Sequence, residues 1–140
     1  AADRDGIRAA VAALRPLAPK GPLIVGGQSY GGRQASMVVA DDPAFADALL
    51  LTSYPLHPPG KPEKLRTEHL PEIAAPTVIV HGRSDAFAAS DELAAAATLF
   101  AGPVHIVEVD KADHGLKPER SGVGELTADA VEQYLLTETP

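Results

Sequence analysis

The sequence has 140 residues, of which 45% are apolar and 22% are charged, and its formal net charge is −7. This length and composition indicate one soluble globular domain, residues 1–140, with a single core. The negative charge disfavours binding to nucleic acid, the absence of cysteine excludes disulfides and thiolate chemistry, and no apolar run is long enough to span a membrane.

The first predicted element is an amphipathic helix. Asp5 is placed to cap it, its apolar residues recur at helical spacing, and Pro16 forces it to end. A short loop then leads to a predicted strand at Leu23–Val25, and helix-compatible sequence follows over residues 33–40.

The segment between this strand and this helix reads Gly27-Gln28-Ser29-Tyr30-Gly31. A serine on a sharp strand-to-helix turn has a strained backbone and an exposed hydroxyl, and the glycines two residues before and after it remove side chains that would clash. The pattern therefore predicts a nucleophile elbow with Ser29 as the nucleophile.

Further strands and helices alternate along the rest of the chain. Residues 48–51 form a continuous apolar run typical of a strand buried on both faces, and strands are also predicted at Thr77–Val80 and Val104–Val109. Ser90 is placed to cap a helix between the last two strands, and a final helix covers roughly 126–135. This alternation predicts an α/β fold with a parallel sheet of about four strands flanked by helices.

Residues 54–76 contain six prolines, a density that excludes regular helix or central strand over most of the segment. We expect a long ordered loop or a small lid here, which would shape the substrate pocket.

Three polar residues follow predicted strands: Ser29 the first, Asp85 the third and His114 the fourth. In parallel sheets, sites lie at the carboxyl ends of the strands. A serine hydroxyl needs a base in order to attack an ester, a histidine suits that task, and a carboxylate fixes the tautomer of the histidine. Asp110 and Asp113 are rival acids, but Asp85 is the preferred candidate.

Two neighbours of the predicted elbow also receive roles. The backbone N–H of Tyr30 is expected to be one oxyanion donor, helped by the positive end of the following helix. Arg33 is expected to be a structural or substrate-orienting cation, because a guanidinium is always protonated and cannot act as a base. The four other histidines lack the spacing of metal ligands, so no metal site is expected.

The whole chain resembles the α/β-hydrolase superfamily, and more closely the small bacterial hydrolases akin to dienelactone hydrolase and the hydrolase-like domain of an animal chromatin-complex subunit. Residues 26–33, residues 53–62, His81-Gly82 with Asp85, and Asp113-His114 carry the resemblance. It implies a nucleophile at Ser29, an acid at Asp85 and a base at His114. It also implies hydrolysis of small or short-acyl esters through an acyl-enzyme, without a cofactor.

In that superfamily about four strands precede the elbow strand, and one of their loops supplies the second oxyanion N–H. The present sequence begins one helix before the elbow, so a truncated or minimal form of the fold is expected. This departure supports an alternative, a catalytically silent interaction module or a fragment of a longer hydrolase. It also makes Leu23–Val25 an open sheet edge, through which we expect homo-oligomers to form. A cytoplasmic location is expected.

Overall fold

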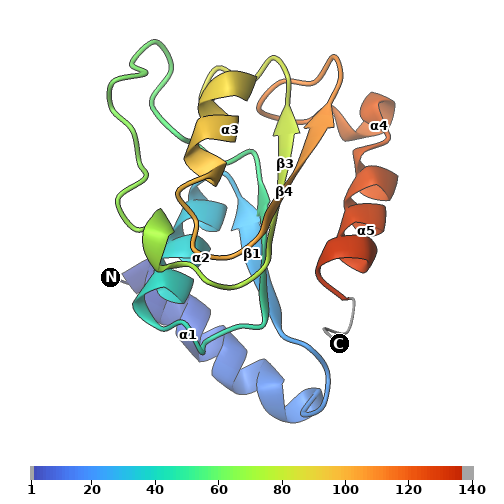
Figure 1. Cartoon of the computed structure of the whole chain (residues 1–140). Helices are drawn as coiled ribbons and strands as arrows, with labels where there is room; N and C mark the ends of the chain where they lie inside the picture. The colour runs from blue at the N-terminus through green and yellow to red at the C-terminus, as the bar shows by residue number, and fades with distance from the viewer. Residues whose placement is uncertain (1, 137–140) are drawn as a thin grey trace.

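The central element of the computed structural model, which describes residues 2–136, is a parallel sheet of four strands in the order β1-β2-β3-β4 (Figure 1). The strands are β1 (Ile24–Gln28), β2 (Ala48–Thr52), β3 (Thr77–Gly82) and β4 (Val104–Val109). Each strand pairs in parallel with the next strand of the chain. The predicted α/β fold with a parallel sheet of about four strands is thus confirmed.

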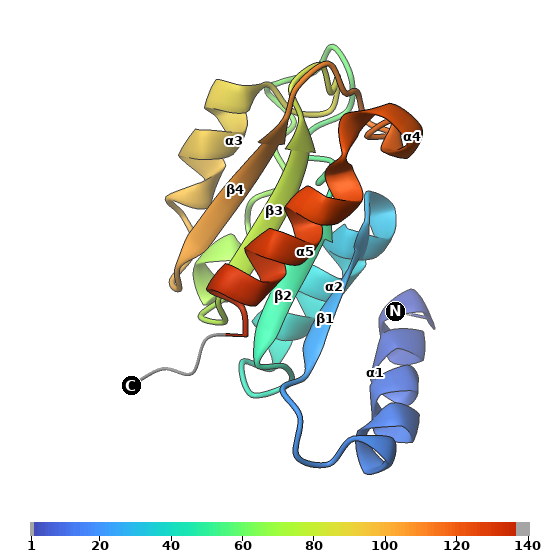
Figure 2. The same ribbon diagram turned by 90° about the vertical axis from the view of Figure 1, so that its right-hand side faces the viewer.

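Helices cover both faces of the sheet (Figure 2). They are α1 (Ala2–Leu14), α2 (Tyr30–Asp41), α3 (Ser90–Ala97), α4 (Pro118–Ser121) and α5 (Val123–Tyr134), with short 3₁₀ turns at Arg15–Leu17 and Leu70–Glu72. The first three helices lie on one face and α5 lies on the other (Figure 1). Within residues 2–136, none of these helices is long and apolar enough to cross a membrane.

The core consists of one apolar cluster on each face of the sheet. Leu49, Leu51 and Ile79 are buried under α2 and α3, whereas Val78 and Val80 are buried under α5. Successive residues of a strand point to opposite faces, so strands covered on both sides must be apolar throughout. Each of these side chains stabilises the fold by about 1.5–3 kcal/mol through its burial.

Two predicted helix caps are wrong. α1 extends over Ala2–Leu14, so Asp5 lies inside its first turn. Its carboxylate is attracted by the positive end of the helix there but does not cap it. Ser90 is the first residue of α3, and Ala89 occupies the cap position. The Glu92 carboxylate accepts the Ala89 N–H at 2.9 Å and thereby replaces the missing side-chain cap.

The proline-rich segment has no regular structure apart from the turn at Leu70–Glu72, but it is not a surface loop throughout. Tyr54, Leu56, Leu70 and Ile73 are buried in the cluster that also holds α2 and α3. These residues anchor the segment to the core. Its role as a lid that shapes a substrate pocket stays a prediction.

β1 forms one edge of the sheet (Figure 2). The Ser29 N–H donates to the Thr52 carbonyl at 2.8 Å, so the odd-numbered residues of this strand face β2. The backbone groups of Ile24, Gly26 and Gln28 therefore point away from the sheet, and a groove of about 310 Å³ runs along the strand. Association of two copies through this edge stays a prediction.

Candidate active site

Ser29 lies between the last residue of β1 and the first residue of α2, with φ 51° and ψ −120°. A serine rarely adopts a positive φ, so this turn is strained and presents the side chain at the carboxyl edge of the sheet. A Cβ at position 27 would lie 2.7 Å from the backbone of Gly31, and a Cβ on Gly32 would lie 2.5 Å from the Gly27 carbonyl. The turn thus requires glycine at 27 and 32.

The predicted steric role of Gly31 is wrong, because a Cβ there would meet no heavy atom within 4 Å. Gly31 lies in the first turn of α2 and its missing side chain would point into open space. The backbone of β1 at Gly27 does approach the backbone of α2 at Gly31 and Gly32 closely, but the positions at which a Cβ would clash are 27 and 32.

His114 belongs to the loop that follows β4. Its Nε2 lies 2.8 Å from the Ser29 Oγ, although 85 residues separate the two in the sequence. The ring of Phe87 stacks on the imidazole, with 4.1 Å between ring centroids and 28° between planes. The histidine is therefore held in contact with the serine, with an aromatic ring on one face.

Asp85 follows β3, and its side chain is fully buried. Its Oδ2 and Oδ1 lie 2.8 and 3.0 Å from the Nδ1 of His114, and its Oδ1 also accepts the Phe87 N–H at 2.8 Å. The rival acids lie elsewhere: Asp110 pairs with Arg83, and Asp113 accepts the N–H of Gly115. Of the three candidate acids, the structure brings Asp85 to the ring.

Tyr30 is the first residue of α2, and the first bond of this helix runs from the Arg33 N–H to the Ser29 carbonyl. The Tyr30 N–H therefore has no acceptor within its own helix and lies next to the serine. The phenol donates to the Asp3 carboxylate at 2.6 Å, and this bond raises the pKa of Tyr30. The backbone N–H of Tyr30 thus lies beside Ser29, whereas its side chain binds Asp3 of α1.

Two residues that contact the histidine were not predicted from the sequence. Phe87 stacks on the ring of His114, and the hydroxyl of Ser53 donates to the His114 carbonyl at 2.6 Å. Nothing in the sequence around Phe87 indicates that this residue contacts the histidine. Ser53 did carry a signal, because it directly follows a strand, as Ser29 does.

The other histidines are dispersed. His57 is buried in the proline-rich segment, His105 lies in β4 and stacks on Tyr134, and His69 contacts the hydroxyl of Ser36. Burial lowers the pKa of His81, and neither of its ring nitrogens has a hydrogen-bond partner among residues 2–136.

His57 gives the fold a pH-dependent contact. Its Nδ1 donates to the Pro58 carbonyl at 2.8 Å, and its Nε2 faces the Glu92 carboxylate at 3.2 Å. The Pro58 bond raises the pKa of His57, and Glu92 and then Glu63 raise it further against the opposing effect of burial. A raised folded-state pKa stabilises the fold below the ordinary value of 6.5 and loses this contribution as pH rises through the folded value.

We therefore expect the His57 contribution to the free energy of unfolding to fall as pH rises above 6.5 through the raised folded-state value, whereas the pKa values of His69 and His81, which burial lowers, act in the opposite direction. The Glu92→Gln variant should lose part of the His57 contribution, and its stability should therefore change with pH differently from that of the wild type, because glutamine still accepts the Ala89 N–H but no longer favours the imidazolium. Glu72→Gln, at an exposed position, is the matched control. Urea denaturation at several pH values measures this pH dependence, and the same pH dependence in all three proteins would refute this assignment.

Gly82, at the end of β3, lets the loop that carries His114 pass close to the sheet. A Cβ at this position would lie 2.6 Å from the Ala112 carbonyl and closer still to that of Asp113. The Gly82→Ala variant is expected to lose about 1–3 kcal/mol of stability, because the loop must move to make room for the added Cβ.

The control for Gly82→Ala is Gly6→Ala, in the exposed middle of α1, where a Cβ meets nothing within 4 Å. It should gain up to about 1 kcal/mol, since alanine is the better helix former. Chemical denaturation of both variants tests the pair. Unchanged stability in Gly82→Ala would show that the loop adapts without cost.

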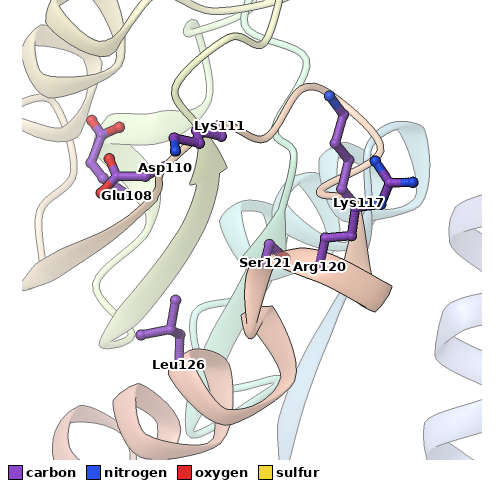
Figure 3. A pocket seen from close by; sticks show the side chains of 7 residues that line it. All are labelled: Glu108, Asp110, Lys111, Lys117, Arg120, Ser121 and Leu126. Atoms are coloured by element: carbon purple, nitrogen blue, oxygen red, sulfur yellow. The ribbon is translucent and has the colours of Figure 1, made fainter.

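A pocket of about 540 Å³ opens beside the end of β4, where residues after that strand face α4 and the start of α5 (Figure 3). Its lining residues are Glu108, Asp110, Lys111, Lys117, Arg120, Ser121 and Leu126. Ser29, Asp85 and His114 do not line it, so this mixed-charge pocket is separate from the three residues that the structure brings together.

Solved structures similar to the chain include an α/β serine hydrolase homologue from Coxiella burnetii, with 20% identity and a TM-score of 0.68 over 91% of this chain and 56% of that one. The esterase domain of a Rhodothermus marinus protein has 19% identity and a TM-score of 0.70, over 94% of this chain and 69% of that one.

Dienelactone hydrolase from Anabaena variabilis is also similar, with 20% identity and a TM-score of 0.66 over 92% of this chain and 58% of that one. The chain thus spans little more than half the length of this enzyme and of the Coxiella protein. Residues 4–137 match the family model of an α/β-hydrolase domain. The chain therefore belongs to the α/β-hydrolase family.

Proposed function

We propose that this protein is a serine hydrolase, a carboxylesterase that acts on small or short-acyl esters through an acyl-enzyme intermediate. The observation that carries the proposal is the chain of two contacts from the Ser29 Oγ to the His114 Nε2 and from the His114 Nδ1 to Asp85, each 2.8 Å long. Membership of the α/β-hydrolase family supports hydrolase chemistry, and the likeness to an esterase domain and to a dienelactone hydrolase supports an ester substrate.

In the first half of the reaction, Asp85 accepts the Nδ1–H of His114 and so leaves the Nε2 lone pair facing Ser29. As the Oγ attacks the ester carbonyl, its proton passes to Nε2, and Asp85 stabilises the imidazolium that forms. Collapse of the tetrahedral intermediate breaks the bond to the leaving alcohol, which takes the proton from Nε2. The products of this half are the free alcohol and Ser29 acylated on its Oγ.

In the second half, a water molecule takes the place of the alcohol. His114 accepts one proton from the water as its oxygen attacks the acyl carbon, and then returns that proton to the Ser29 Oγ as the bond to serine breaks. The acid leaves and the enzyme is restored. The same histidine thus acts first as base and then as acid in each half.

The negative oxygen of each tetrahedral intermediate would be stabilised by the N–H of Tyr30 at the positive end of α2. Loss of one oxyanion donor typically costs about 10²–10³ in turnover, so the Tyr30 N–H has a large effect on the rate in this proposal. Arg33, one turn into the helix, cannot accept the serine proton. Its role in this proposal is structural or substrate-orienting.

The alternative is a catalytically silent interaction module. The open edge of β1 is the observation that favours it, because unpaired backbone groups at a sheet edge bind partner strands. A silent module has no chemical need for a serine, a histidine and a buried carboxylate in mutual contact, and for this reason we prefer the enzyme.

The test is reaction of the folded wild-type protein with a fluorophosphonate, followed by peptide mass spectrometry, in parallel with hydrolysis of p-nitrophenyl butyrate. We expect one adduct, on the peptide that contains Ser29, and turnover above that of heat-denatured protein. A folded protein that gains no adduct and hydrolyses the ester at the background rate would favour the silent module.

A further inference from the structure

Ser53 directly follows β2 and has a φ of 53°. This left-handed conformation suits glycine, which has no Cβ, and to a lesser degree asparagine. A serine at such a position has a strained backbone, and strain of this kind concentrates at functional sites. The contacts of the serine side chain should therefore explain why position 53 is a serine and not a glycine.

The side chain of Ser53 is buried and links the sheet to the loop that carries His114. The Ser53 N–H donates to the Val80 carbonyl at 2.8 Å, which ties the residue to β3. Its hydroxyl, in a residue that is 0% exposed, donates to the His114 carbonyl at 2.6 Å. The main chain of the histidine is thus hydrogen-bonded to a residue that the sheet itself holds in place.

The loop that carries His114 has no regular structure to hold it in place. The segment from the end of β4 to α4 contains no helix or strand, and Lys111, Leu116 and Lys117 all have positive φ. The imidazole of His114 must nevertheless meet Ser29 with one nitrogen and Asp85 with the other. Since ring position depends on main-chain position, a small shift of the loop weakens both contacts, and a displacement of 1 Å can cost about 100-fold in rate.

We propose that Ser53 is a positioning residue for the hydrolase reaction: its buried hydroxyl fixes the main chain of His114 so that the ring meets Ser29 and Asp85 together. The inference rests on the proposed function, because it concerns the base of that reaction. Ser53 itself does not touch the reacting atoms in this scheme and acts through the histidine.

Two substitutions separate the hydroxyl from the strained backbone. Ser53→Ala removes the hydroxyl and keeps the Cβ at positive φ, whereas Ser53→Gly removes the hydroxyl and relieves the strain. The matched control is Ser36→Ala. Ser36 is also 0% exposed, and its hydroxyl donates to the Arg33 carbonyl at 2.6 Å and contacts the His69 Nε2 at 2.7 Å, so this variant loses buried hydroxyl contacts away from His114.

We expect Ser29 of both position-53 variants to react with fluorophosphonate, with loss of fluoride, about 10- to 100-fold more slowly than in the wild type. For p-nitrophenyl butyrate, kcat should fall while KM changes by less than about twofold, because substrate binding does not involve the histidine main chain. In proton NMR, the Nδ1–H resonance of His114 should shift or broaden. Ser36→Ala should keep the wild-type rate and resonance, although its stability falls.

Wild-type rates in Ser53→Ala and Ser53→Gly would overturn the inference, and so would an equal loss in Ser36→Ala. If Ser53→Ala does not fold, as judged by circular dichroism, Ser53→Gly alone decides the question, because it introduces no strain. A wild-type protein that does not react at all would reject the proposed function instead. The His114 resonance still tests the contact in that case, since it requires no turnover.

Discussion

Replacing Ser29 with alanine is expected to remove the fluorophosphonate adduct and to lower ester turnover by at least about 10⁴-fold, the loss typical of removing the nucleophile of such a set. No other hydroxyl can take its place at that point, because the turn between β1 and α2 presents Ser29 alone, with its Oγ 2.8 Å from the histidine. Intact-protein mass spectrometry and the p-nitrophenyl butyrate assay measure the two losses.

The control for this substitution is Ser84→Ala. Ser84 lies next to Asp85 in the sequence and is exposed, so a general effect of serine removal near the site would also appear there. The Ser84→Ala variant should react like the wild type. Equal labelling of Ser29→Ala and wild type would show that the probe reacts with a different residue, and the proposed mechanism would then fail.

Replacing Asp85 with asparagine is expected to lower turnover about 10⁴-fold while leaving the fold intact. The Asp85 Oδ1 accepts the Phe87 N–H at 2.8 Å, and the asparagine carbonyl can keep that bond. Its amide NH₂ then faces the Nδ1 of His114 and donates to it. The ring must place its proton on Nε2 in that state, so it cannot accept the proton of Ser29.

Asp110→Asn and Asp113→Asn are the matched controls, because the same chemical change occurs on the loop after β4 without contact to the ring. The partners of these two residues are Arg83 and the N–H of Gly115, and both variants should retain most of the turnover. Kinetics and circular dichroism of the three variants decide the matter. If Asp85→Asn were nearly fully active and Asp113→Asn were inactive, the acid of the mechanism would be Asp113 and not Asp85.

The two central strands, β2 and β3, could be predicted because they are buried on both faces and are therefore mostly apolar. The predicted bounds of the last strand also agree with β4 (Val104–Val109), an edge strand that contains His105 and Glu108 and is only partly buried, because its β-branched residues favour a strand and turn residues bound it at each end. The first strand was predicted to end at Val25, but β1 continues to Gln28. Glycines 26 and 27 look like a turn in the sequence, yet pairing with β2 extends through both of them.

The helix ends could not be predicted from residue type alone. A serine at position 90 is a good cap by its chemistry, but the chain turns one residue earlier, and the carboxylate of Glu92 satisfies the free N–H instead. The final helix begins earlier than predicted, at Val123, after a short helix at Pro118–Ser121 that no periodic pattern indicates. A single turn is too short to show periodicity.

The three predicted site residues lie together because the order of strands fixes which loops meet. A parallel sheet brings the ends of β1, β3 and β4 to one edge, and the residues after them could be chosen from the sequence for that reason. What could not be predicted is how the histidine is held. The contacts of Phe87 and Ser53 with His114 depend on backbone paths that only the folded chain defines.

The open edge of β1 has a consequence for hydrogen exchange. Amides of Val25 and Gly27 face β2 and should exchange slowly, whereas those of Ile24, Gly26 and Gln28 face outward and should exchange fast, so protection alternates along the strand. A strand added at this edge would slow the outward set alone. Exchange spectra recorded over a range of protein concentrations would thus detect association of the chain at single-residue resolution and locate it beside Ser29.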